Sequence, residues 1–289
     1  MFYSLNTIIY IMEKKYCIIT GANAGIGKAS AIELAKKGFH IVMFCRNKEK
    51  AEKARQEIAE QSEHPVDLII CDLASQKSIR QAAKQYTQNY DRVDVLLNNA
   101  GFIAKQKEKT EDGIESTLAV NHLGPFLLTN LLFELIQKTP NARVVNVSSE
   151  AHKYASFDLD NLELDKGYDN MKDYCLSKLC NIMFTHELAK KLKDTSATTY
   201  SLHPGVVASN FQDNTHGFLG AIFSLIRPFM ISSEKGASTS VFLATDPGVT
   251  KFNGKYFEKK TLKKPKSVAY DDTLCHQLWD RSKKMSNLK

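Results

Sequence analysis

The sequence predicts an α/β protein with one doubly wound parallel sheet of about seven strands and helices on both faces. Short apolar runs alternate along the chain with longer amphipathic runs. The short runs are apolar throughout, which is typical of parallel strands that are covered on both faces. Strand and helix alternate at the spacing that right-handed crossovers need, so the units are expected to build one continuous sheet.

Each element has its own signal in the residues. The first helix is expected to end at Gly38, and the His64-Pro65 pair is expected to end the second. The expected strands cover residues 16–20, 39–44, 66–71, 93–97, 143–147, 198–202 and 255–257. The expected helices cover residues 26–37, 48–61, 75–90, 110–137, 169–193 and 233–244. With no internal repeat or linker, residues 15–289 are predicted to form one domain after an N-terminal extension over residues 1–14.

Composition excludes several classes of protein. The 289 residues are 43% hydrophobic and 25% charged, as in ordinary globular domains. The longest apolar stretches are about eight residues, against the ~20 that a membrane-spanning helix needs. In the first residues the apolar run Phe2–Met12 precedes the charges of Glu13, Lys14 and Lys15, whereas a secretory signal carries its positive charge first. We therefore expect a cytoplasmic protein with no integral membrane segment; a weak interfacial anchor is the alternative for the extension.

Cysteines and charge give no sign of a metal or a nucleic acid. None of the six cysteines is in a Cys-x-x-Cys pair or in a cluster with zinc-ligand spacing, so buried reduced thiols are expected and no metal site. The net charge of +7 can attract an anionic cofactor. A basic run near the C-terminus, with no nucleic-acid motif beside it, is interpreted as solvated surface; it comprises Lys259, Lys260, Lys263, Lys264 and Lys266.

A glycine-rich turn follows the first expected strand and opens the first expected helix. It runs from Thr20 to Gly27 and contains Gly21, Asn23, Gly25, Ile26 and Gly27. Its glycines allow close backbone approach, and the helix N-terminus offers N–H groups to a pyrophosphate. This strand–turn–helix context indicates a Rossmann-type dinucleotide site, with a simple tight turn as the alternative. The spacing does not fit the P-loop, because Ala29 follows Lys28 where Ser or Thr is required.

The end of the second expected strand favours NADP(H) over NAD. An NAD site places an acidic residue there, but residues 39–48 contain none, and Arg46 stands in that position. A guanidinium can hold a 2′-phosphate through two hydrogen bonds. The alternative is a surface arginine at a strand end. Asp72 and Leu73, after the third strand, are expected at the adenine, where the alternative for Asp72 is a turn role.

Several further motifs occur in order along the chain. They are Asp72-Leu73, Asn98-Asn-Ala-Gly101, Asn121, Ser148-Ser149, Tyr174-x3-Lys178 and Pro204-Gly205. Together with the glycine turn, they resemble the short-chain dehydrogenases over about residues 15–257. The segments 45–47, 121–129, 143–152 and 203–207 resemble the retinol-dehydrogenase-like branch in particular. The N-terminal membrane anchor of many members of that branch is not carried over to this chain.

The chemistry expected of such a family needs an acid and base for the substrate oxygen. Tyr174 and Lys178 lie at i and i+4, hence on one helix face. We expect Tyr174 to act as the acid and base, and Lys178 to lower its pKa from ~10 and to bind the nicotinamide ribose. A helix-surface pair is the alternative. Ser149, 25 residues before Tyr174, is expected to hold the substrate oxygen, and Ser148 is its rival.

The remaining site residues follow from local geometry and from the resemblance. Pro125 has no N–H for the carbonyl of Asn121, so a kink and a carbonyl available to a proton-relay water are expected; the alternative is a simple bend. Asn98 is expected to bond ribose or neighbouring backbone, with Ala100 and Gly101 leaving room for cofactor. Pro204, Gly205 and Val207 are expected at the nicotinamide. Four residues are interpreted as structural: His122, His152, Tyr154 and His203.

Residues 206–232 are rich in large apolar side chains, and we interpret them as a lid over a lipophilic substrate. Packing on the core or on a partner subunit is the alternative. The predicted function is NADP(H)-dependent hydride transfer between nicotinamide and a carbonyl or alcohol carbon of an aldehyde, ketone, retinoid or steroid-like molecule. Alternatives are NAD-linked alcohol oxidation, a C=C reductase and a non-catalytic NADP(H) sensor. A homo-oligomer, dimer or tetramer, is implied by the resemblance.

Overall fold

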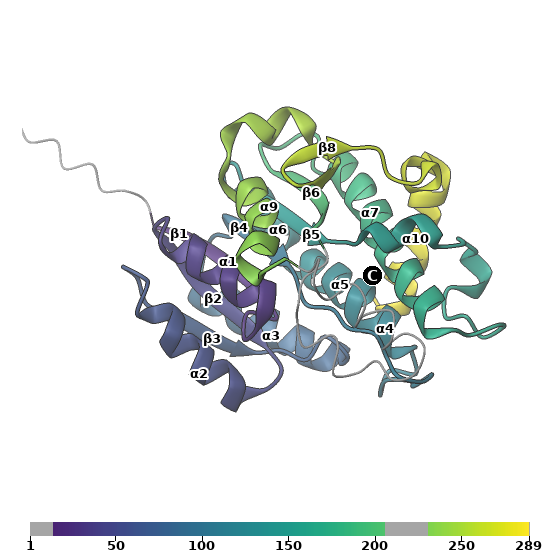
Figure 1. The fold of residues 1–289 in the computed structure, drawn as a ribbon, viewed down its shortest axis with the longest axis horizontal. Helices are drawn as coiled ribbons and strands as arrows, with labels where there is room; N and C mark the ends of the chain where they lie inside the picture. The colour runs from purple at the N-terminus through teal and green to yellow at the C-terminus, as the bar shows by residue number, and fades with distance from the viewer. Residues whose placement is uncertain (1–13, 206–230, 289) are drawn as a thin grey trace, which may run out of the picture.

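The computed structural model describes residues 14–205 and 231–288, and these form one sheet flanked by helices (Figure 1). The strand order is β3-β2-β1-β4-β5-β6-β7-β8. All neighbours are parallel except β7 and β8. The strands are β1 Lys15–Thr20, β2 Phe39–Cys45, β3 Val66–Ile70, β4 Val95–Asn98, β5 Arg143–Val147, β6 Thr198–His203, β7 Tyr256–Glu258 and β8 Thr261–Lys263. The predicted doubly wound fold is confirmed, with an eighth strand added at one edge.

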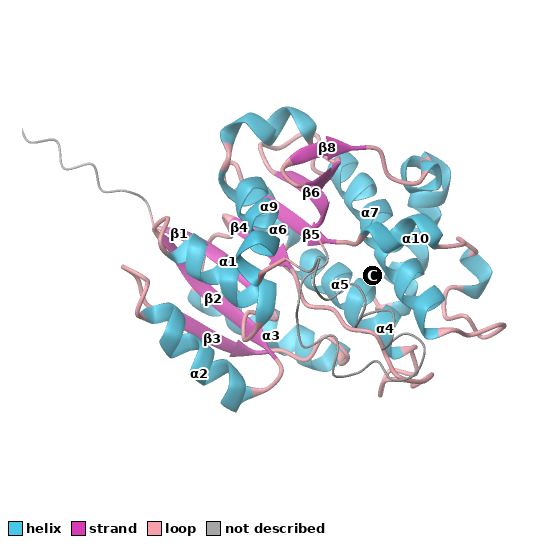
Figure 2. Ribbon diagram, viewed as in Figure 1, coloured by secondary structure: helices cyan, strands magenta, loops and turns pink. Residues whose placement is uncertain are grey.

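Helices cover both faces of the sheet (Figure 2). The helices are α1 Gly25–Ala35, α2 Lys48–Ala59, α3 Gln76–Asn89, α4 Ser116–Leu118, α5 Gly124–Leu131, α6 Phe133–Lys138, α7 Asn170–Lys191, α9 Ser233–Thr245 and α10 Asp272–Met285. Alternate residues of β1 enter different cores: Ile19 packs in the core that α1, α2 and α9 share, and Ile18 in the core under α3 and α5. Both side chains are completely buried, as the uniformly apolar strands predict.

Residues 110–137, which the sequence predicts to be largely helical, are helical only from Ser116 onward and are divided into α4, η1 (Ala119–Leu123), α5 and α6. Gly113 has a φ of 77°, and Glu115 caps α4 by accepting a hydrogen bond from the Leu118 N–H. The π-helical turn η1 follows, and the N–H of Gly124 bonds to the carbonyl of Ala119. Pro125 has no N–H to continue the α-helical pattern, which gives a local reason for the wider turn just before it.

Candidate active site

The carboxyl ends of the parallel strands gather the predicted site residues at one edge of the sheet. Thr20, Asn98 and His203 are the last residues of β1, β4 and β6. The strand order reverses between β1 and β4, because β1 continues to β2 on one side and β4 continues to β5 on the other. In open α/β sheets, ligands bind outside the strand ends at this switch point.

The glycine turn has the backbone geometry of a phosphate cradle. Gly21 and Gly25 have φ values of 67° and 53°, which favour glycine. A Cβ at Gly27 would lie 2.3 Å from the Gly21 carbonyl oxygen and 2.5 Å from Nδ2 of Asn99. No side chain caps the start of α1, and its first turn contains no acidic residue. The turn therefore fits a dinucleotide pyrophosphate, which would meet backbone N–H groups at the helix N-terminus.

Asn99, which was not among the predicted site residues, ties the cradle to β4. Its backbone N–H donates to Oγ1 of Thr20 over 2.9 Å, and its Nδ2 donates to the Thr20 carbonyl over 3.0 Å. The N–H of Ala100 donates to the same Thr20 hydroxyl. The Asn-Asn-Ala-Gly motif was the available signal for this contact. These bonds fix the first turn against the end of the neighbouring strand.

Asn98 was expected to bond ribose or neighbouring backbone, but in the structure its side chain bonds two other side chains. This side chain is buried, and its Nδ2 donates to Oδ1 of Asn146 over 2.8 Å and to Oγ1 of Thr129 over 3.2 Å. Successive residues of a strand point to opposite faces, so Asn98 faces α5 instead. Its role in the structure is to link β4, β5 and α5.

Arg46 lies immediately after β2, and Asp72 lies two residues after the end of β3, as the sequence predicts. Arg46 is exposed, and within residues 14–205 and 231–288 its guanidinium has no ion pair or hydrogen bond. The side chain of Asp72 stabilises the turn after β3, which was the alternative to binding adenine: its Oδ1 accepts the N–H of Ala74 over 2.9 Å. Leu73 is buried, and a Cβ at Gly124 would lie 2.9 Å from its Cβ. Arg46 thus has the freedom that binding a phosphate would require.

Helix α7 brings Tyr174 and Lys178 together beneath the end of β5. The ammonium of Lys178 lies 5.6 Å from the centre of the Tyr174 ring and donates to the Val147 carbonyl over 3.2 Å. The Ser149 hydroxyl is hydrogen bonded to the Tyr174 phenol. The three residues form the contiguous group that an acid and base with an oxygen-binding partner would need.

The pKa of Tyr174 is shifted in the direction opposite to the one predicted. Burial raises it to about 12, and the hydrogen bond with Ser149 opposes this rise without cancelling it. Burial also lowers the pKa of Lys178 to about 8. The phenol is therefore protonated at neutral pH. This is the form that can donate a proton to a substrate oxygen.

Ser148 has a role different from that of its neighbour. Its hydroxyl is buried and donates to the Lys178 carbonyl over 2.6 Å. Ser149 instead caps the short helix η2 (Glu150–Tyr154), where its Oγ accepts the N–H of Ala151. Ser148 therefore secures α7 against β5, and Ser149 is the serine beside Tyr174.

The Asn121 side chain fixes the loop after β4 to α7. Its Oδ1 accepts the N–H of Phe102 over 2.9 Å, while its Nδ2 donates to the Phe102 carbonyl and to Oγ of Ser177. A Cβ at Gly101 would lie 3.0 Å from Nζ of Lys178 and 3.1 Å from Oδ1 of Asn121. Three predicted site residues therefore converge on one point. The expected relay through the Asn121 carbonyl remains a prediction.

Two buried carboxyl groups lie next to this site. Asp173 precedes Tyr174 on α7, and Glu115 caps α4; neither side chain is exposed. Burial and the neighbouring Glu115 raise the pKa of Asp173 far above its usual range. Two carboxylates close together in a buried site cannot both keep their charge, so Asp173 is neutral at neutral pH. No pattern in the sequence indicates that these two residues meet.

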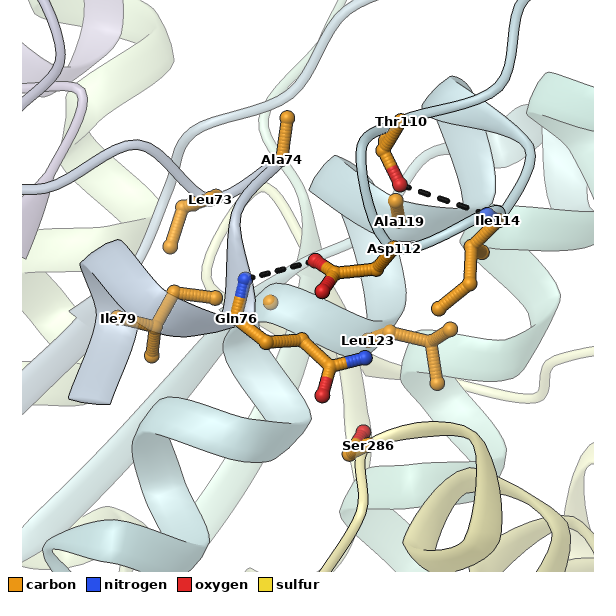
Figure 3. A pocket seen from close by; sticks show the side chains of 11 residues that line it. Leu73, Ala74, Gln76, Ile79, Thr110, Asp112, Ile114, Ala119, Leu123 and Ser286 are labelled. Carbon is orange, nitrogen blue, oxygen red and sulfur yellow. Dashed lines mark hydrogen bonds between the residues drawn. The ribbon is translucent and has the colours of Figure 1, made fainter.

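A small pocket lies apart from Tyr174, between the start of α3 and the loop that precedes α4 (Figure 3). Leu73, Ile79 and Leu123 line it with apolar side chains, and the side chain of Asp112 accepts the N–H of Gln76, another lining residue. The pocket is not lined by any of the candidate catalytic residues, which are Asn121, Ser149, Tyr174 and Lys178. This pocket is therefore distinct from the candidate site at the strand ends.

Val207 falls outside the described residues, as does all of the predicted lid over residues 206–232 except its last two residues. Pro204 and Gly205 follow β6 as expected, and Gly205 has a φ of 95°. A Cβ at Gly205 would lie 2.5 Å from Cδ1 of Ile231, so the chain returns against this turn. Ser232 then caps α9 through the N–H of Lys235.

Three further observations concern the cysteines, metal ligands and long helices of the described residues. All six cysteines are free and buried, as predicted. Over residues 14–205 and 231–288, no group of His, Cys, Asp or Glu could hold a metal ion. No helix in those same stretches has both the length and the apolar character to cross a membrane.

Comparisons with known proteins agree with this geometry. The family model for short chain dehydrogenase matches residues 15–217. Human retinol dehydrogenase 14 is 38% identical, over 96% of this chain and 88% of its own length. Retinol dehydrogenase 12 of Bos taurus is 42% identical, over 93% of this chain and 85% of its own length.

Solved structures share the fold. An uncharacterised protein of Mycobacterium paratuberculosis has a TM-score of 0.77 and 28% identity, covering 95% of this chain and 94% of its own. A short chain dehydrogenase of Shigella flexneri, complexed with NADP, has a TM-score of 0.67 and 21% identity, covering 86% of this chain and 97% of its own. By family match and by fold, this chain belongs to the short-chain dehydrogenases/reductases, is retinol-dehydrogenase-like, and is an oxidoreductase acting on alcohol or carbonyl groups.

Proposed function

We propose that this protein is an NADP(H)-dependent reductase of lipophilic aldehydes or ketones. The observation that carries the cofactor choice is Arg46, exposed at the end of β2 in a segment with no acidic residue from 39 through 48. An acidic residue there would repel a 2′-phosphate, whereas a guanidinium binds one through parallel hydrogen bonds. NAD-linked alcohol oxidation is the competing function.

Each residue has a defined task in this proposal. The turn at Gly21–Gly27 holds the pyrophosphate, Arg46 the 2′-phosphate, and Lys178 the nicotinamide ribose. Bound NADPH supplies the hydride. Ser149 holds the substrate oxygen by a hydrogen bond, and Tyr174 donates the proton that the oxygen needs once the carbon is reduced.

The protonation state of Tyr174 supports reduction at neutral pH. With its pKa raised to about 12 by burial, the phenol carries its proton. A proton donor is needed for carbonyl reduction, whereas alcohol oxidation needs the phenolate. Lys178 beside the ring stabilises the phenolate that remains after the proton has left.

The substrate class has two supports. Residues 211–230 include nine large apolar residues: Phe211, Phe218, Leu219, Ile222, Phe223, Leu225, Ile226, Phe229 and Met230. The relatives are named retinol dehydrogenases, and retinol is a lipophilic alcohol. A long aldehyde, a retinoid or a steroid-like ketone would match such a segment.

The test is NADPH oxidation with a panel of carbonyl compounds that runs from short hydrophilic aldehydes to retinal and a steroid ketone. We expect kcat/KM to rise with apolar chain length. Tyr174→Phe should lower kcat by about 10²-fold or more, because it removes the proton donor. Normal NADPH binding without turnover of any carbonyl would instead favour a cofactor sensor, and activity on C=C bonds alone would favour that class of reductase.

A further inference from the structure

His152 lies inside the short helix η2 that follows Ser149, and its side chain is completely buried. Both ring nitrogens have partners. Nδ1 lies 2.7 Å from the carbonyl oxygen of Ser149, and Nε2 lies 3.2 Å from the backbone nitrogen of Lys266. The ring therefore links the Ser149 turn to a segment more than a hundred residues later in the chain.

These two partners determine where the imidazole proton lies. The Ser149 carbonyl can only accept a hydrogen bond, so Nδ1 must carry a hydrogen. The Lys266 N–H can only donate, so Nε2 must present its lone pair. The geometry thus requires neutral His152 with its proton on Nδ1. Protonation of Nε2 would set two N–H groups against each other.

The Lys266 segment is itself held against the same turn. Nζ of Lys266 donates to the carbonyl of Ala155 over 2.5 Å and to that of Lys153 over 3.4 Å. This corrects the interpretation of Lys266 as part of a solvated basic surface. The ring of Tyr256 packs edge-on against His152, with centroids 5.0 Å apart. The turn is therefore clamped from β7 and from the chain that follows β8.

We propose that His152 is a positioning residue that holds Ser149 in the place where its hydroxyl meets Tyr174 and the substrate oxygen. The inference rests on the proposed function, because it gives Ser149 a part in carbonyl reduction. His152 touches neither substrate nor cofactor in this account and acts only through the Ser149 backbone. Loss of the ring removes the 2.7 Å donor to the Ser149 carbonyl and leaves it with the backbone N–H of His152 at 3.2 Å, so the residue whose hydroxyl bonds the phenol is held less firmly.

The charges around the ring make the clamp sensitive to acid. Burial lowers the pKa of His152, Lys153 and Lys266 add to this effect, and the Ser149 bond and Glu150 oppose it. The titratable groups facing the ring, by element, are Glu150 and Lys153 of η2, Lys266, His203 of β6, and Tyr256 and Glu258 of β7. Because the pKa in the folded state lies below 6.5, the fold begins to lose stability as pH falls through 6.5. The clamp itself opens at the lower, folded-state pKa.

The first test is ¹⁵N NMR of histidine-labelled protein, with the His152 signals assigned by their loss in a His152→Asn variant. We expect a neutral ring that is protonated at Nδ1 at neutral pH and that titrates below 6.5. A ring protonated at Nε2 would overturn the proposal. This measurement needs no turnover, so it remains decisive if the proposed reductase activity fails.

The second test is the pH profile of kcat. Wild-type kcat should fall in acid with the pKa that NMR assigns to His152. An asparagine can donate to the Ser149 carbonyl but does not titrate, so His152→Asn should retain kcat within about threefold and lose this acid limb. His152→Ala should lower kcat by about tenfold, about 1.4 kcal/mol, with the KM for NADPH unchanged. An unchanged acid limb in His152→Asn, or wild-type kcat in His152→Ala, would refute the positioning role.

Discussion

Replacing Lys178 with methionine should stabilise the fold while it abolishes the reaction. The Lys178 side chain is only 3% exposed, and among the described residues its ammonium has one hydrogen bond, to the Val147 carbonyl. An ammonium buried with so little compensation loses most of its hydration. Methionine has a similar length and no charge, so it should fill the same space at a lower cost.

The size of the effect follows from the pKa of Lys178. Burial lowers this pKa from 10.5 to about 8. At about 1.4 kcal/mol for each pH unit, the difference between 10.5 and 8 corresponds to about 3 kcal/mol. Losing the bond to Val147 costs about 1 kcal/mol. That carbonyl keeps a second donor, Nδ2 of Asn181 at 3.3 Å. The net expectation is a gain of about 2 kcal/mol at pH 7.

The gain should depend on pH with a definite sign. The folded protein prefers neutral Lys178, so the cost of its charge is fully present below pH 8 and disappears as pH rises toward 10.5. Urea unfolding of the wild type and of Lys178→Met at pH 7 and pH 10 measures the difference. Lys172→Met, which changes an exposed lysine of the same helix, is the matched control and should change stability little.

Activity provides the second half of the prediction. Lys178→Met should lower kcat by about 10²-fold or more, because the phenolate of Tyr174 loses its stabilising charge and the ribose loses a donor. A variant that is less stable than wild type at pH 7, or whose stability difference is the same at pH 7 and pH 10, would refute the reasoning about the buried charge.

Three further perturbations test other parts of the structure. Gly27→Ala should weaken NADPH binding by at least about tenfold in calorimetry, because its Cβ would lie 2.3 Å from the Gly21 carbonyl oxygen. Gly38→Ala is the control: an alanine there has room for its Cβ but is strained at the positive φ, so this variant should be less stable and should bind NADPH as tightly as wild type. Asp173→Asn should raise the free energy of unfolding, and the gain over wild type should be larger at pH 8 than at pH 5. The reason is that the folded wild type keeps this carboxyl protonated, which costs more free energy as pH increases. The same gain at pH 5 and at pH 8 would contradict a neutral Asp173 beside Glu115. The six buried cysteines should react with a maleimide only after unfolding, and rapid labelling of the native protein would show that at least one is accessible.

The sequence was sufficient for the sheet because its strands are uniformly apolar and its helices end at visible signals. It was not sufficient for the hairpin between β7 and β8. That turn contains Lys259 and Lys260 at φ values of 49° and 60°, where glycine or asparagine is normally found. Because this turn consists of two lysines, the sequence contains no turn signal there, and the strand after the turn was not predicted.

The position of a site residue was predictable where the residue follows a strand end, as for Arg46 and the glycine turn. The site was not predictable where a shift of one residue along a strand moves a side chain to the other face of the sheet, as for Asn98 and Asn99. Contacts between distant segments were also hidden. The pair of Glu115 and Asp173 and the bond from Lys266 to His152 join elements whose approach only the folded chain determines.

The most direct test of the NADP(H) assignment is a fluorescence titration of NADPH and NADH against wild type, Arg46→Ala and Arg281→Ala. Arg281 is an exposed arginine on α10 and controls for the loss of one positive charge. We predict that wild type and Arg281→Ala bind NADPH at least about tenfold more tightly than NADH, and that Arg46→Ala loses this preference while NADH affinity stays the same. Equal affinity of the wild type for both cofactors would contradict the 2′-phosphate role of Arg46 and leave NAD-linked oxidation as the better account.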